Sequence, residues 1–181
     1  MPNWVENILT IRGPRVREFM MACAGYSPIY SSDGGKEEII IRLLNGDFYG
    51  KFKFNALVPV PENVLQQGYS EAGYYWQIDN WGTKWDIDDE DIFEYHIGIE
   101  YACIGFCTAW SPPLSWLKKV SELYPDLHFE LKYVEMGCFF AGCMNTYKDC
   151  IHHKHYDTDC DKFWEIAEEF GYVREDFSDD D

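Results

Sequence analysis

One heptapeptide brings together side chains that could bind a ligand. It reads Asn80-Trp81-Gly82-Thr83-Lys84-Trp85-Asp86, so two indoles flank a turn-forming glycine beside an amide, a hydroxyl, a cation and a carboxylate. Trp110 and Ser111 lie at the end of a predicted strand, where a loop-borne site would sit. An aromatic cleft with a few polar contacts is the usual composition of a ligand pocket. The candidate binding residues are therefore Asn80, Trp81, Thr83, Lys84, Trp85, Asp86, Trp110 and Ser111.

A purely structural interpretation of the same residues stays open. The tryptophans would then cap the sheet, and Lys84 would pair with Asp79 or Asp86. No nucleophile–base pair accompanies the heptapeptide, and the chain lacks the P-loop, dinucleotide-binding, zincin and nucleophile-elbow motifs. The sequence therefore favours binding over catalysis, and we name no catalytic residue.

Cysteine and histidine gather in a second segment, between residues 138 and 160. Both are ligands of zinc in proteins, but the spacing is loose and contains no Cys-x-x-Cys pair. One interpretation is a zinc site made of Cys150, His152, His155 and Cys160. The other is a set of free thiols with a solvated, histidine-rich loop, in which case the protein has no cofactor.

The chain is strongly acidic, with 15 basic and 32 acidic residues and a formal net charge of −17. Because phosphate neutralisation needs a basic patch, this balance argues against direct nucleic-acid binding and against an anionic membrane surface. The acidic blocks are either solvated loop and frayed tail or a negative face that steers a basic partner. The candidate acidic surface comprises Asp86, Asp88, Asp89, Glu90, Asp91, Glu94, Glu175, Asp176, Asp179, Asp180 and Asp181.

The sequence shows no secretory signal and no membrane-spanning stretch. Its start, MPNWVENILTIRG, lacks a basic region followed by an apolar run, and every apolar run is far shorter than the roughly 20 residues of a spanning helix. Seven cysteines, an odd number, argue against a closed disulfide framework. We expect a cytoplasmic protein whose thiols are mostly free.

Hydrophobic periodicity predicts alternating strands and helices. Strands are predicted at 4–11, 38–43, 48–56, 93–108, 129–136 and 138–147, and helices at 14–25, 112–124 and 163–170. Asn45-Gly46 predicts a hairpin turn, and Ser111 is a plausible N-cap for the second helix. Residues 61–91, rich in glycine and aromatic residues, are predicted to be an insertion with short helical pieces at 62–67 and 71–78.

This order of elements indicates an α+β fold. Two strand–helix–strand halves around one antiparallel sheet form the ferredoxin-like pattern, here with helices on one face and a further C-terminal helix. We expect a single domain over residues 1–171, interrupted by the aromatic and acidic insertion at about 61–91 and followed by an acidic tail at 172–181.

Five short motifs also carry a resemblance to a known family. In order they are PNWVEN at 2–7, ALVPVP at 56–61, NWGTKWD at 80–86, TAWSPP at 108–113 and YPDL at 124–127. With these motifs the chain resembles the YubB-type ferredoxin-like domain family of phage and plasmid proteins over most of residues 1–147. The family name describes a fold, so the resemblance implies no iron–sulfur cluster. It implies a mobile-element context and no particular reaction.

Three functions follow from these observations. The first is a non-enzymatic phage or plasmid protein that inhibits a basic host or defence protein through an acidic, aromatic surface, in one form by mimicking DNA. The second is a small-ligand-binding domain in which Trp81, Trp85 and Trp110 line the site. The third is a metal-dependent enzyme built on the cysteine and histidine segment. The sequence leaves the oligomeric state open.

Overall fold

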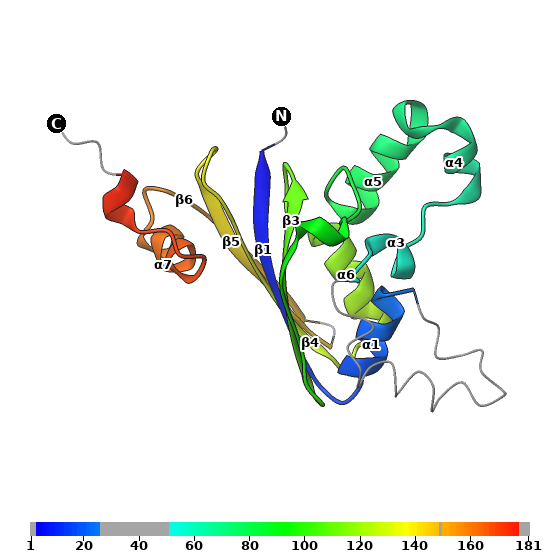
Figure 1. Ribbon diagram of the computed structural model, residues 1–181, viewed down its shortest axis with the longest axis horizontal. Helices are drawn as coiled ribbons and strands as arrows, with labels where there is room; N and C mark the ends of the chain where they lie inside the picture. The colour runs from blue at the N-terminus through cyan, green and yellow to red at the C-terminus, as the bar shows by residue number, and fades with distance from the viewer. Residues whose placement is uncertain (1–2, 26–50, 149, 178–181) are drawn as a thin grey trace.

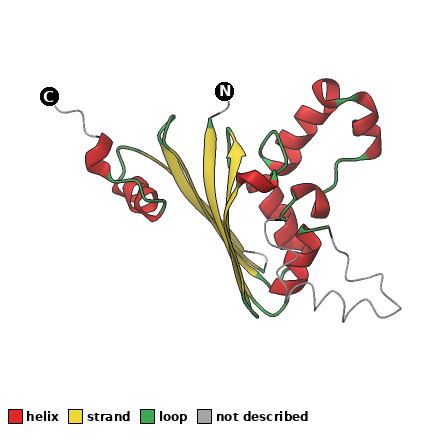
Figure 2. Cartoon of the chain, viewed as in Figure 1, coloured by secondary structure: helices red, strands yellow, loops and turns green. Residues whose placement is uncertain are grey.

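The framework of the protein is one six-stranded antiparallel sheet. The computed structural model describes residues 3–25, 51–148 and 150–177. In it the strands run in the order β2-β3-β1-β4-β5-β6. Figures 1 and 2 show the sheet between the group of helices on one side and α7 on the other. Their bounds are β1 (Trp4–Arg12), β2 (Ile92–Ile97), β3 (Tyr101–Ala109), β4 (His128–Glu135), β5 (Phe140–Tyr147) and β6 (Cys150–Asp157). The predicted α+β class with a ferredoxin-like sheet is therefore confirmed.

One face of the sheet carries the main core. Strand β1 alternates strictly, so Val5, Leu9 and Ile11 are buried on this face. Figure 1 shows most of the helices on this side. They are α1 (Val16–Cys23), α3 (Phe54–Leu57), α4 (Glu62–Gln67), α5 (Tyr74–Trp81) and α6 (Leu114–Leu123). The apolar residues of α1 and α6 recur every three or four positions, which directs one stripe of each helix into the core.

The C-terminal helix lies on the other face. Helix α7 (Asp161–Glu169) packs Phe163, Trp164 and Ile166 against Val134 and Ala141 in a second, smaller apolar cluster (Figure 1). Successive strand residues point to opposite faces, and Tyr133 and Val134 are neighbours in β4. Val134 therefore points to the face of α7, whereas Tyr133 points to the face of the main core. The sheet is thus a shared wall between two cores of unequal size.

The insertion is helical, as its sequence predicts. The piece expected at 62–67 is α4, and the piece expected at 71–78 falls on a π-helical turn η1 (Tyr69–Gly73) continued by α5. A short 3₁₀ helix η2 (Asp89–Asp91) leads into β2, and another, η3 (Arg174–Phe177), follows α7. None of the helices described is long and apolar enough to cross a bilayer.

The predicted strand at 48–56 is wrong over its described part. The predicted strand at 38–43 and the Asn45-Gly46 turn lie outside the described residues. Residues 51–53 have no regular structure, and the chain turns into α3 at Phe54. Phe52 and Phe54 are both fully buried, as an alternating strand pattern would require. A side-chain carboxylate, described below, accepts the backbone N–H groups that a neighbouring strand would otherwise bind.

Three further expectations need correction. The predicted strand at 93–108 is a hairpin of β2 and β3, closed where the Gly98 N–H donates to the Tyr101 carbonyl at 2.6 Å. The histidine-rich segment expected to be a loop is the edge strand β6, whose polarity reflects side chains that are almost all exposed. Ser111 does not cap α6, since Pro113 occupies the N-cap position.

Candidate binding site at the tryptophan cluster

Three exposed tryptophans from distant parts of the chain lie together around one lysine. Trp4 begins β1, Trp85 follows α5, and Trp110 ends β3. Their side chains are 43%, 39% and 51% exposed, although indoles are highly buried on average. The Trp4 and Trp85 ring centroids are 6.3 Å apart. We call Trp4, Lys84, Trp85 and Trp110 the tryptophan cluster.

The lysine of this cluster is held by aromatic rings. Lys84 Nζ lies 3.8 Å from the ring centroid of Trp85 and 4.3 Å from that of Trp110. Both distances are well inside the roughly 6 Å limit for a cation–π interaction. Lys84 forms no ion pair within the part of the chain that the structure describes, so the pairing with Asp79 or Asp86 is not observed. The ammonium group of Lys84 therefore lies against the rings of both Trp85 and Trp110.

An unusual backbone conformation presents Trp110 to solvent. Its φ is 73°, in the left-handed region that residues with a Cβ seldom adopt. The backbone N–H of Trp110 donates to the Asn3 carbonyl at 2.9 Å, and the Thr108 hydroxyl donates to the Ser111 carbonyl at 2.9 Å. Such a conformation costs about 1–3 kcal/mol and persists where the surroundings fix it. Here the strained backbone conformation holds an aromatic side chain exposed to solvent, and strain of this kind is typical of a binding site.

The other half of the heptapeptide is buried and positions the exposed half. Trp81 is 1% exposed and donates its Nε1–H to the Val58 carbonyl at 2.9 Å. Thr83 is fully buried, and its hydroxyl donates to the Ala109 carbonyl at 2.9 Å. These two residues lie in the core, so they do not line a site.

A glycine turn connects the two halves. Gly82 ends α5 with φ 88°, and the Ser111 hydroxyl donates to its carbonyl at 2.5 Å. A Cβ on Gly82 would lie 3.1 Å from the Leu114 nitrogen, so the turn also lets the chain approach α6 closely. Asn80 donates to the Trp76 carbonyl at 2.7 Å and accepts from Lys119. Asn80 and Ser111 thus hold the local structure, and the residues left for a ligand are Lys84, Trp85 and Trp110.

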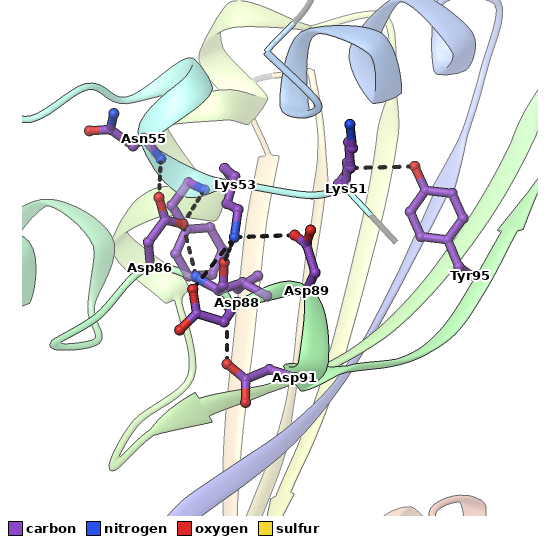
Figure 3. Close-up of polar contacts among 10 residues, drawn as sticks. Lys51, Lys53, Asn55, Asp86, Asp88, Asp89, Asp91 and Tyr95 are labelled. Atoms are coloured by element: carbon purple, nitrogen blue, oxygen red, sulfur yellow. Dashed lines mark hydrogen bonds and ion pairs between the residues drawn. The ribbon is translucent and has the colours of Figure 1, made fainter. Parts of the chain in front are cut away.

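Asp86 is a structural carboxylate. It accepts backbone N–H groups from Phe54 at 2.6 Å, Ile87 at 2.9 Å and Asn55 at 3.1 Å (Figure 3). Burial raises the pKa of this carboxyl above its ordinary value, although these hydrogen bonds and nearby Lys53 act in the opposite direction. Asp86 therefore joins α3 to the segment that carries the tryptophan cluster and does not belong to an acidic surface.

Most carboxylates that follow Asp86 also have partners in the protein. Lys53 Nζ lies 3.7 Å from Asp88 Oδ1 and 3.3 Å from Asp89 Oδ1, as Figure 3 shows. Asp88 and Asp91 form a reciprocal cap on η2. The carboxylate of Glu94 accepts from the Cys103 thiol at 3.6 Å. Asp88, Asp89 and Glu90 are nevertheless exposed, so the block still presents negative charge to solvent.

The C-terminal acidic residues lie apart from that block in the chain. Glu175 and Asp176 are exposed in η3, after α7. Asp179, Asp180 and Asp181 lie outside the described residues. The acidic segments are evident in the sequence. In the structure some of their carboxylates form contacts within the protein, and others are exposed to solvent.

A cavity of about 330 Å³ adjoins the tryptophan cluster at Trp110. Asn3, Cys138 and Phe140 complete its lining. Asn3 Nδ2 donates to Cys138 Sγ at 2.8 Å, and the Glu135 carboxylate accepts the N–H groups of Gly137 and Cys138, which fixes this wall. The sequence did not indicate that Asn3, Trp4, Cys138 and Phe140 belong to this region. These positions are far apart in the chain, and only the pairing of the strands brings them together.

The four residues of the zinc interpretation do not converge. Cys150 and His152 point to one face of β6, and His155 points to the other, because His155 lies three positions after His152, an odd offset. His155 Nδ1 instead lies 3.2 Å from the Tyr133 hydroxyl, which also contacts His153 Nε2 at 2.8 Å. Burial, with a contribution from His155, lowers the pKa of His153. In residues 3–25, 51–148 and 150–177 no three Cys, His, Asp or Glu side chains are placed to hold a metal.

Comparison with known proteins identifies the family. Residues 80–174, just over half of the chain, match the ferredoxin-like domain of Api92-like proteins. The crystal structure of the protein api92 from Yersinia pseudotuberculosis is similar in fold, with a TM-score of 0.57 and 12% identity, covering 87% of this chain and 99% of that one. The sequence matches none of the curated proteins. The chain therefore belongs to the family of Api92-like proteins that share this ferredoxin-like domain.

Proposed function

We propose that this protein is a non-enzymatic binding protein that recognises a basic protein partner through the tryptophan cluster. The observation that carries the proposal is the cation held between two exposed indoles, Trp85 and Trp110. A surface that already accommodates its own ammonium group in this way suits an arginine or lysine from a partner. Lys84 then acts as an internal occupant that the partner's cation displaces.

The surroundings of the cluster support this chemistry. Tryptophan is enriched among the residues that carry most of the energy of protein interfaces. Asp88 follows Trp85 by three residues, so it lies at most about 10 Å away along the chain. Exposed carboxylates at that range attract a basic partner and speed its association at low salt.

The biological setting that we propose comes from the resemblance to phage and plasmid proteins of the YubB type. In that setting the protein would act in the cytoplasm of a host cell and inhibit a host or defence protein by occupying it. The nucleic-acid-mimic form of this hypothesis draws less support, because Asp86, Asp88, Asp89 and Asp91 serve contacts within the protein.

Binding of a short arginine-rich peptide tests the proposal, with tryptophan fluorescence and calorimetry as readouts at low salt. The same peptide with glutamine in place of arginine controls for non-specific contacts. We expect Trp85→Ala to weaken binding of the arginine peptide at least tenfold. Lys84→Met, which keeps the aliphatic stem and removes the competing charge, should strengthen it.

The matched control is Tyr75→Ala, which removes an aromatic ring that is 64% exposed and lies outside the cluster. It should leave the affinity unchanged. Equal affinity for the arginine and glutamine peptides, or a Trp85→Ala variant that binds as well as the wild type, would refute recognition through the cluster. Low-salt capture from host extract, compared between wild type and Trp85→Ala, then identifies the natural partner.

A second candidate function is the binding of a small molecule in the cavity beside Trp110. Its volume of about 330 Å³ lies at the lower end of the range for ligand pockets. A panel of nucleotides and metabolites, followed by tryptophan fluorescence, separates this function from peptide binding. A response to a panel member that Trp110→Ala abolishes and that the arginine peptide does not reproduce would favour the small ligand.

A further inference from the structure

The second face of the sheet contains a basic cavity, which is unexpected in a chain of net charge −17. It has a volume of about 310 Å³ and lies where β4, β5 and β6 meet α7. Lys132, Lys154 and Lys162 all line it, and none of the described side chains in the lining is acidic. We propose that this cavity binds a small molecule that carries phosphate groups.

The strand register explains why two of the lysines meet. Cys143 in β5 is paired directly with Lys132 on one side and with Lys154 on the other. Side chains paired across neighbouring strands share a face of the sheet, with Cβ atoms about 4.5–5.5 Å apart. Lys132, Cys143 and Lys154 therefore form one row on this face, with the cysteine between the two lysines.

The next rows supply uncharged groups that suit the same ligand. Asn145 and His152 are paired with each other beside the lysine row, and Tyr156 lies on its other side. An amide and an imidazole can donate hydrogen bonds to phosphate oxygens, and the tyrosine ring offers an apolar surface for the organic part of a ligand. All three line the cavity.

Helix α7 closes the cavity with the third lysine. Lys162 lies in its first turn, and Ile166 follows one turn later on the same side. The packing of Phe163 and Trp164 on the sheet fixes this helix, so the position of Lys162 is set by the smaller apolar cluster. The cavity is thus bounded by the sheet on one side and by α7 on the other.

Two of the lysines are currently paired with carboxylates that an anion would replace. Lys132 Nζ lies 2.7 Å from Glu169 Oε1 and 3.8 Å from Glu130 Oε1, and Lys162 pairs with Glu165. The Lys162–Glu165 pair is exposed and the pairs of Lys132 are partly exposed, and pairs at the surface contribute only about 0.2–1 kcal/mol each. Lys154 forms no ion pair with any described residue. A phosphate, with up to two negative charges and several acceptor oxygens, can therefore compete for all three ammonium groups.

The size and surroundings of the cavity favour a small molecule over a nucleic acid. A duplex presents a long row of phosphates and needs an extended basic surface, whereas the three lysines occupy one cavity on an acidic protein. The proposal is also separate from the tryptophan cluster, because the two sites share no residue.

Protection of Cys143 from alkylation tests the proposal directly. Intact protein is treated with iodoacetamide in the presence of pyrophosphate, adenosine diphosphate or adenosine, at constant ionic strength, and labelling is measured residue by residue by mass spectrometry. At ten times the dissociation constant, mass action predicts about tenfold slower labelling of Cys143. Cys150, which is exposed at the start of β6 and lines neither cavity, is the internal control and should label at an unchanged rate.

The three probes distinguish the part of the ligand that is recognised. Protection by both pyrophosphate and adenosine diphosphate supports phosphate recognition alone, and protection by adenosine diphosphate only supports recognition of phosphate together with an organic group. Absence of protection by either at millimolar concentration, or equal protection by adenosine, overturns the proposal.

Charge variants supply a matched control. Lys154→Glu should abolish protection, whereas Lys118→Glu, an identical change on the exposed side of α6, should not. Glu169→Gln removes the nearer of the two carboxylates beside Lys132 and should increase affinity several-fold, whereas Glu122→Gln on α6 should have no effect. If both members of either pair behave alike, the effect belongs to the overall charge, and the proposal of a specific site is refuted.

Discussion

Asp86 shows how one side chain can replace a strand. Its carboxylate accepts three backbone N–H groups from Phe54, Asn55 and Ile87, and this lets the chain enter α3 with Phe52 and Phe54 both in the core. An isolated buried charge is costly, and burial accordingly raises the pKa of this carboxyl. The residue thus stabilises the fold through its hydrogen bonds, at a desolvation cost that depends on pH.

We predict that Asp86→Asn lowers the free energy of unfolding by about 1–3 kcal/mol, because an amide loses one acceptor and turns a donor toward backbone N–H groups. Since the folded pKa is raised, the folded state takes up the proton first as the pH falls. The stability gained from this proton uptake is therefore greatest below the unfolded pKa of Asp86 and is lost as the pH rises through the folded pKa, and it adds to the contribution of the hydrogen bonds. Urea denaturation of both proteins between pH 7 and pH 4 should show the wild-type advantage increasing. An advantage that shrinks on acidification would contradict this linkage.

At the scale of elements, α7 stands apart from the other helices. It packs on the second face of the sheet through its own apolar cluster, while α1, α3 and α6 share the main core with β1. Small cooperative units of this kind can open without global unfolding. Because Lys162 belongs to α7, its docking also determines whether the basic cavity exists.

Phe163→Ala should therefore detach α7 and leave the main core folded. Phe163 is fully buried, and truncation of such a side chain costs about 3–5 kcal/mol. Hydrogen exchange should show the amides of α7 losing protection while those of β1 keep theirs. The control is Leu123→Ala, which shortens a side chain that is 55% exposed and should change neither region. Simultaneous loss of protection in α7 and β1 would show that the protein unfolds as one unit.

At the scale of the whole molecule, charge is the dominant property. A net charge of −17 on 181 residues favours solubility and disfavours compactness through self-repulsion. The charge is distributed unevenly over the molecule. Lys132, Lys154 and Lys162 gather on one face of the sheet. The exposed carboxylates of the 86–94 segment follow the tryptophan cluster in sequence. The two proposed sites thus attract ligands of opposite charge.

Added sodium chloride should stabilise the protein. Screening is nearly complete beyond about 10 Å at 0.1 M ionic strength, so self-repulsion weakens as salt is added. A gain of about 1 kcal/mol would raise the Tm by roughly 2–4 °C for a protein of this size. Thermal denaturation between low and moderate salt measures the effect. A Tm that falls with salt would mean that favourable ion pairs outweigh the net repulsion.

The sequence by itself determined the class of the fold and the positions of most of its elements. Periodicity located β1, β4, β5, α1, α6 and α7, because alternation and helical spacing depend on which face of each element is buried. The composition of the heptapeptide at 80–86 predicts a binding site. Its glycine turn and aromatic residues are local properties that sequence reasoning can assess.

Only the tertiary structure decided which of those residues are available to a ligand. Burial of Trp81 and Thr83, and the arrival of Trp4 beside Trp85, depend on contacts between positions far apart in the chain. Strand β6 also depends on tertiary contacts, because its polar sequence forms a strand by pairing with the edge of β5. The lysine row exists for that reason as well, since a register shift of one residue would move Lys154 to the other face. Local patterns in the sequence specify the helices and strands. Strand pairing and packing determine which side chains from different elements come into contact, and a binding site is formed by such contacts.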